Sequence, residues 1–128
     1  MRVIRGLFIV ILIACVAGWS VVATMLRLRR HRFGAKWWVA AGLLTVLGAI
    51  GGMWTTMYLE YEVCTRARAV GWPVPVVVFV LEGDQWTDFV PPTIVQYGAV
   101  AADTMVGIAV ALMPVTIWSW ILTRRPRR

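Results

Sequence analysis

The sequence predicts an all-α membrane protein with three transmembrane helices and a small extracytoplasmic β-hairpin between the second and third helices. Hydrophobic residues make up 60% of the 128 residues and only 15% are charged, whereas about 25% of a soluble domain is charged. Three apolar runs are each long enough to cross a hydrocarbon core of about 30 Å as a helix: residues 6–26, 37–59 and 95–122. We therefore expect residues 1–128 to form a single integral membrane domain.

The first span, residues 6–26, follows two arginines and therefore has two interpretations. Arg2 and Arg5 before an apolar run resemble the start of a signal peptide, and Leu12-Ile13-Ala14-Cys15 fits a lipoprotein cleavage box. However, the sequence stays apolar from Cys15 as far as Leu26, where a processed lipoprotein becomes polar. We expect an uncleaved spanning helix, with a cleaved signal or a lipoprotein anchor as the alternatives.

The second span, residues 37–59, precedes an outer segment of residues 60–92. We expect the helix to continue to about Ala69, because Glu62 and Arg66 then form a favourable i,i+4 pair. Gly71 suits the end of a helix, and the prolines that follow it prevent its resumption.

The remainder of the outer segment predicts a hairpin. Gly83 and Asp84 lie between two β-prone runs, which is typical of a tight turn. A turn there places Leu81 opposite Trp86 and Val77 opposite Val90.

The third span, residues 95–122, belongs to an apolar run that begins at Thr93. At 1.5 Å per residue the 30 residues of that run would measure about 45 Å as a helix, more than a bilayer core requires. The helix therefore has to tilt, bend or project, and Pro114 is the expected site of a bend.

The distribution of Lys and Arg predicts the orientation. The loop 27–36 and the tail 123–128 hold nine of these cations, and the opposite side holds four. The positive-inside rule places the loop and tail in the cytoplasm and the N-terminus outside, in the inner (plasma) membrane. The residues that anchor this topology are Arg27, Arg29, Arg30, Arg32, Arg124 and Arg125.

The net charge of +7 does not indicate nucleic-acid binding, because the cations form blocks beside the apolar runs rather than a phosphate-binding face. The chain has one histidine and lacks a glycine-rich phosphate loop, so we expect no metal site, no cofactor and no catalytic residues. The expected partners are the lipid bilayer and a second copy or another membrane protein.

Asp103 is the only ionisable residue within a predicted span. The aromatic residues at the outer boundary are Trp54, Tyr58, Tyr61 and Tyr97. Asp103 lies about 9 Å below Tyr97, level with Gly52 on the antiparallel second helix, so Thr55 or Thr56 can bond its carboxyl group. Such an acid forms an interhelical hydrogen bond, extends toward the membrane interface, or serves as a proton or cation site. Small residues at helical spacing, including Gly48, Gly52 and Gly107, predict close packing within the chain, against a second copy or against another protein.

Two short motifs, Gly71-Trp72-Pro73-Val74-Pro75 and Trp86-Thr87-Asp88-Phe89, resemble segments of small bacterial multi-pass inner-membrane proteins. The resemblance covers about residues 66–125 and implies a bacterial inner membrane, without an activity. The expected function is therefore that of a non-enzymatic membrane protein that packs with itself or a partner. The alternative is a small oligomeric transporter or proton or cation pathway that uses Asp103.

Overall fold

The computed structural model describes residues 2–89 and 93–124, which include three long helices. These are α1 (Arg2–Arg30), α2 (Ala35–Tyr58) and α3 (Thr93–Arg124). Each helix is long and apolar enough to cross a membrane. The three predicted spans are therefore confirmed as helices, although α1 and α3 extend beyond the predicted bounds. Arg125 lies outside the described residues.

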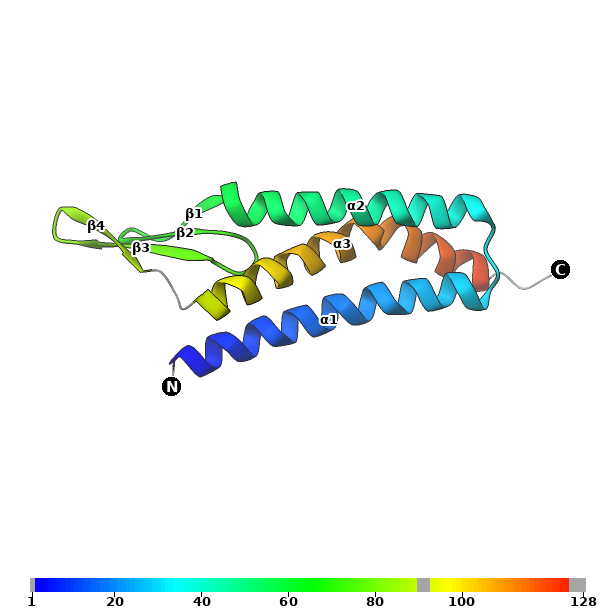
Figure 1. The fold of residues 1–128 in the computed structure, drawn as a ribbon, viewed down its shortest axis with the longest axis horizontal. Helices are drawn as coiled ribbons and strands as arrows, with labels where there is room; N and C mark the ends of the chain where they lie inside the picture. The colour runs from blue at the N-terminus through cyan, green and yellow to red at the C-terminus, as the bar shows by residue number, and fades with distance from the viewer. Residues whose placement is uncertain (1, 90–92, 125–128) are drawn as a thin grey trace.

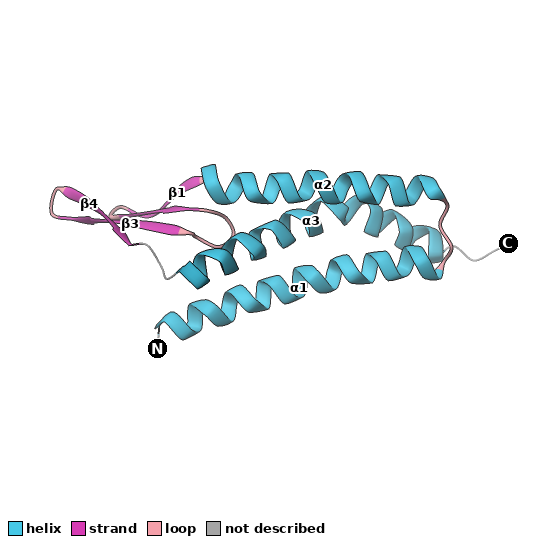
Figure 2. Cartoon of the chain, in the orientation of Figure 1, coloured by secondary structure: helices cyan, strands magenta, loops and turns pink. Residues whose placement is uncertain are grey.

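The three helices form a bundle in which α3 lies between α1 and α2 (Figure 1). α3 packs along both neighbours, whereas α1 and α2 have little contact with each other in the described part of the chain. We call the end of the bundle that carries the strands the sheet end, and the end at which residues 31–34 join α1 to α2 the loop end (Figure 2).

Two clusters of buried apolar side chains fill the bundle. The cluster near the sheet end comprises Val10, Val74, Ala99 and Ala102. The cluster near the loop end comprises Leu28, Ala41, Leu112 and Val115. Both clusters draw residues from α3, so this helix supplies part of the core at each end.

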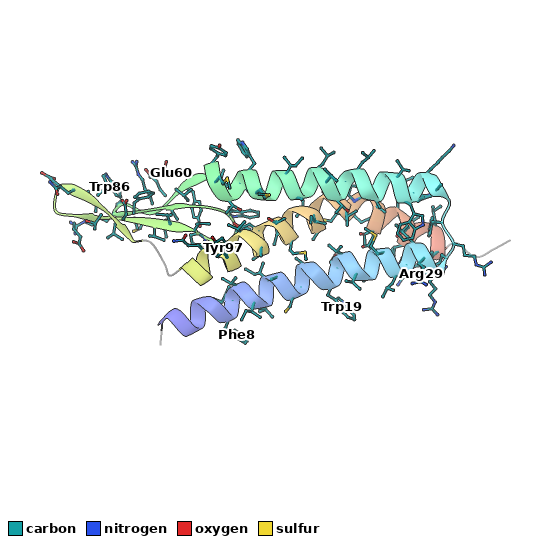
Figure 3. All side chains as sticks on the ribbon, in the orientation of Figure 1. Phe8, Trp19, Arg29, Glu60, Trp86 and Tyr97 are labelled. Carbon is teal, nitrogen blue, oxygen red and sulfur yellow. The ribbon has the colours of Figure 1, made fainter. Side chains whose placement is uncertain are left out.

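The outer surface of the helices is apolar. Trp19 is 75% exposed and Phe8 is 67% exposed, and Figure 3 shows both side chains projecting away from the bundle. Large exposed apolar residues also occur along α2 and α3, for example Leu47 and Ile117. A continuous apolar surface of this kind is suited to lipid rather than to water, as expected for a membrane protein.

A four-stranded antiparallel sheet connects α2 to α3, where the sequence predicts a single hairpin. Its strands are β1 (Glu60–Cys64), β2 (Ala67–Val70), β3 (Val77–Glu82) and β4 (Gln85–Phe89), in the spatial order β1-β2-β3-β4. The predicted hairpin is confirmed as β3 and β4, with Leu81 opposite Trp86. Gly83 in its turn has a φ of +68°, which glycine adopts without strain. The predicted partner of Val77, Val90, lies outside the described residues.

The predicted extension of the second helix to Ala69 is wrong. α2 ends at Tyr58, and the extended backbone of Leu59 leads directly into β1. The β-prone residues Tyr61 and Val63 favour a strand here. β2 pairs with β3 and so extends the hairpin into a larger sheet. The additional strands stabilise the hairpin, which is only marginally stable in isolation.

Glu62 pairs with Arg68 on β2 and not, as expected for a helix, with Arg66. The guanidinium of Arg68 lies 3.4 Å from the carboxylate of Glu62 and 3.9 Å from that of Glu60, both on β1. It also lies 4.9 Å from the ring centroid of Trp86 on β4, and Figure 3 shows Glu60 and Trp86 on the same face of the sheet. The Arg68 side chain thus connects the two edge strands across one face. Each of these exposed ion pairs contributes about 0–1 kcal/mol.

Pro114 lies inside α3, which continues without a break to Arg124. Because proline has no N–H, the carbonyl of Val110 loses its usual helical partner. Figure 1 shows that α3 bends along its course, as expected for a helix with an internal proline.

Candidate functional site

The contact between α2 and α3 depends on glycines that allow the two backbones to touch. A Cβ added to Gly48 would lie 2.6 Å from the carbonyl oxygen of Gly107, and one added to Gly52 would lie 2.6 Å from that of Asp103. A Cβ on Gly107 would meet the backbones of Gly48 and Gly52. The predicted small-residue surfaces therefore face each other within one chain.

The carboxyl group of Asp103 lies at the sheet end of this contact and is only 1% exposed. Its Oδ2 lies 3.0 Å from the hydroxyl of Thr56 on α2. Its Oδ1 accepts a hydrogen bond of 3.0 Å from the backbone N–H of Val74, in the loop between β2 and β3. One side chain of α3 therefore binds both α2 and the segment that carries the sheet.

The loop of residues 71–75 is folded back so that Val74 reaches the helices. Gly71, with a φ of +103°, reverses the chain directly after β2. The N–H of Gly71 donates to the carbonyl of Leu59 at 3.0 Å, and the N–H of Val76 donates to the carbonyl of Val70 at 2.7 Å. These bonds hold the loop closed, and Val74, only 6% exposed, packs against Ala99 and Ala102 of α3.

Two further residues surround the Asp103 carboxyl group. The hydroxyl of Thr55 donates to the carbonyl of Gly52 at 2.9 Å and lies 3.4 Å from the carbonyl of Trp72. The pKa of the Tyr61 phenol on β1 is raised above its ordinary value, mainly by burial and to a smaller extent by the negative charge of Asp103. Asp103 thus lies at the junction of α2, α3 and the sheet.

The structure brings together all the intramembrane residues singled out from the sequence. Asp103, Gly48, Gly52, Thr55 and Gly107 line one hollow of about 290 Å³ between α2 and α3. Thr56 lies beside it and bonds Asp103. The other residues that line the hollow include Gly51, Val106, Val110 and Ala111, so its wall is apolar apart from the carboxyl and hydroxyl groups.

Sequence reasoning missed two polar contacts. The bond from the N–H of Val74 could not be found from residue types, since every residue except proline has a backbone N–H. The second contact joins α1 to α3, where the hydroxyls of Thr24 and Thr116 lie 2.7 Å apart. Each threonine has a serine at helical spacing, Ser20 for Thr24 and Ser119 for Thr116, and such polar small residues favour contact between membrane helices.

The two oxygens of the Asp103 carboxyl group connect α2 to the loop between β2 and β3. Among the described residues, no buried side-chain polar atom lacks a hydrogen-bond partner. No group of three His, Cys, Asp or Glu side chains is placed to hold a metal ion in the same part of the chain. Comparison of the chain with protein-family models, with curated proteins and with solved structures found no match.

Proposed function

We propose that this chain is a non-enzymatic membrane protein that acts by association, and that it presents its outer sheet to another membrane protein or to a second copy. The main support for the proposal is that both carboxyl oxygens of Asp103 make a hydrogen-bonding contact. Its carboxyl oxygens contact Thr56 on α2 and Val74 in the sheet-bearing segment. An intramembrane acid used in this way holds the sheet in a fixed position on the helices.

The exposure of the sheet supports the proposal. β1 and β4 form its two edges, and within the described residues neither edge pairs with another strand. Exposed strand edges are a template for pairing with another chain. Trp86 and Trp72 are 43% and 51% exposed at the same end of the molecule, and exposed tryptophans are enriched in protein interfaces.

A transporter or a proton or cation pathway is the second candidate, because Asp103 borders the hollow between α2 and α3. A pathway would need further polar groups along its length, and the hollow is mainly apolar. Three helices also do not enclose a pore, so this function would require an oligomer.

One experiment separates the two candidates. Asp103→Asn is compared with the unchanged chain for mass in mild detergent and for ion flux in proteoliposomes. The association proposal predicts the same oligomeric mass for both, together with no flux that depends on residue 103. A flux that is abolished by Asp103→Asn, with mass and stability intact, would establish the pathway instead.

The natural cysteines report on self-association directly. Cys64 is exposed on the edge strand β1, and Cys15 is exposed on α1. With Cys15→Ser in place, oxidation in native membranes is expected to form a Cys64–Cys64 dimer if copies meet at the sheet. If Cys64 remains monomeric and no other membrane protein copurifies in fixed stoichiometry, the association proposal is wrong.

We also propose that the sheet end lies outside the cytoplasm of a bacterial inner membrane and the loop end inside it. The ratio of nine to four cations supports this orientation. Alkaline phosphatase fused into the turn at Gly83 is expected to be active, and the same enzyme fused after Arg128 is expected to be inactive. The reverse pattern of activities would show the opposite orientation.

A further inference from the structure

A crevice at the loop end, between α1 and α3, combines an apolar wall with a cationic rim. Its volume is about 470 Å³. Val22 and Leu26 of α1 form part of the apolar wall, and Arg27, Arg30 and Arg124 stand at the rim. From this arrangement we infer that the crevice binds one anionic phospholipid, with its phosphate among the three arginines and an acyl chain along the apolar wall.

The charges at the rim have no counter-ion in the surrounding sequence. Residues 1–59 and 104–128 contain no Asp or Glu. By contrast, Arg68 at the sheet end is paired with two glutamates. The C-termini of α1 and α3 each contribute a partial charge of about −0.5, which leaves a clear excess of positive charge from three guanidinium groups. The crevice therefore has a positive potential that attracts an anion from outside the chain.

One of the rim arginines is held in place before any ligand arrives. The guanidinium of Arg124 lies 3.7 Å from the ring centroid of Trp120, a cation–π contact. Trp120 itself lines the crevice. This contact reduces the side-chain freedom that Arg124 would lose on binding, and a guanidinium stacked on a ring can still donate its N–H groups to phosphate oxygens.

The same observations favour a lipid over other occupants. A free phosphate ion would leave the apolar wall without a partner. A second copy in the same orientation would bring its own arginines against these arginines. Basic pockets between transmembrane helices at the cytoplasmic surface are where anionic head groups bind. The inference goes beyond the proposed function and does not depend on association through the sheet.

The test uses native mass spectrometry of the full chain in mild detergent, with phosphatidylglycerol or phosphatidylcholine of the same acyl chains. We expect phosphatidylglycerol to bind at least about tenfold more tightly, because each arginine near an anionic head group adds to the preference. R27Q/R30Q/R124Q is expected to abolish the preference. The conservative variant R27K/R30K/R124K is expected to keep most of it, which separates loss of charge from loss of fold.

A matched control removes the same charge from the same end. Arg29, Arg32 and Lys36 are exposed and do not line the crevice, so R29Q/R32Q/K36Q should leave the preference within about twofold of the unchanged chain. An equal loss in this control would show a diffuse charge effect and overturn the site. Equal binding of the two lipids would do the same. Displacement of the lipid by millimolar inorganic phosphate would show a simple anion site and overturn the assignment to a lipid.

Discussion

Gly52→Ala is expected to lower the free energy of unfolding by about 1–3 kcal/mol, the range found for overpacked cores. The added Cβ would lie 2.6 Å from the carbonyl oxygen of Asp103 and 2.8 Å from the Cα of Thr104. Both atoms belong to the backbone of α3, so the two helices have to separate. The measurement is an unfolding titration with SDS in mixed micelles, followed by loss of helical circular dichroism.

The adjacent glycine provides the control for this effect. A Cβ on Gly51 would meet nothing within 4 Å, and alanine is favoured over glycine in a helix by about 1 kcal/mol. Gly51→Ala should therefore leave stability unchanged or raise it. If Gly51→Ala and Gly52→Ala destabilise the protein equally, close backbone contact between α2 and α3 is not what stabilises the bundle.

Asp103→Leu is expected to release the loop that carries Val74 and to destabilise the protein by about 1–3 kcal/mol. The buried N–H of Val74 would lose its acceptor, and an unsatisfied buried donor costs about that amount. Hydrogen exchange resolved at the Val74 amide measures the effect. The amide is expected to be protected in the unchanged chain and to exchange rapidly in Asp103→Leu.

Asp103→Asn should behave differently, because an amide can make both contacts. Its oxygen can accept from Val74, and its N–H can donate to the hydroxyl of Thr56. The Thr56 hydroxyl can donate its single hydrogen to the carbonyl of Gly52, which lies 2.8 Å away. Its oxygen can then accept a hydrogen bond from the asparagine N–H. We expect Asp103→Asn to keep the Val74 amide protected and to cost less than about 1 kcal/mol.

Thr56→Val separates the two contacts of Asp103. It removes the hydroxyl and leaves the bond from Val74 in place. The Val74 amide should therefore stay protected in Thr56→Val, with a loss of stability of about 0.6 kcal/mol, typical of an interhelical hydrogen bond in a membrane. Unchanged protection of Val74 in Asp103→Leu would mean that the carboxyl group does not hold the loop.

The helices were predictable from the sequence because a membrane-spanning helix depends on local features. Length and hydropathy define the spans, and the fixed rise per residue places Asp103 level with Gly52 and next to Thr56. The close contact at Gly48 and Gly107 followed from small residues at helical spacing. These properties can be read from neighbouring residues without knowledge of the fold.

The hairpin of β3 and β4 was predictable, but β1, β2 and the loop that follows them were not. β1 and β2 exist because β2 pairs with β3, and strand pairing joins residues that are distant in sequence. The spacing of Glu62 and Arg66 also suits an ion pair on a helix, so local preference could not decide between a helix and a strand in this segment. The return of Val74 to Asp103 depends on a backbone N–H and on the reversal at Gly71. Neither is visible before the sheet is known.

The central position of α3 has a consequence for the order in which the protein assembles. α1 and α2 are synthesised first, yet they have little contact with each other and meet mainly through α3. The strands of residues 60–89 are also complete before Asp103, which contacts the loop between β2 and β3, leaves the ribosome. Until the final helix is made, the described part of the sheet is attached only to the end of α2, through the bonds of Leu59 and Thr55. Chains cut short before α3 should therefore lack most of the contacts that hold the bundle together, so the last helix completes the assembly of the whole molecule.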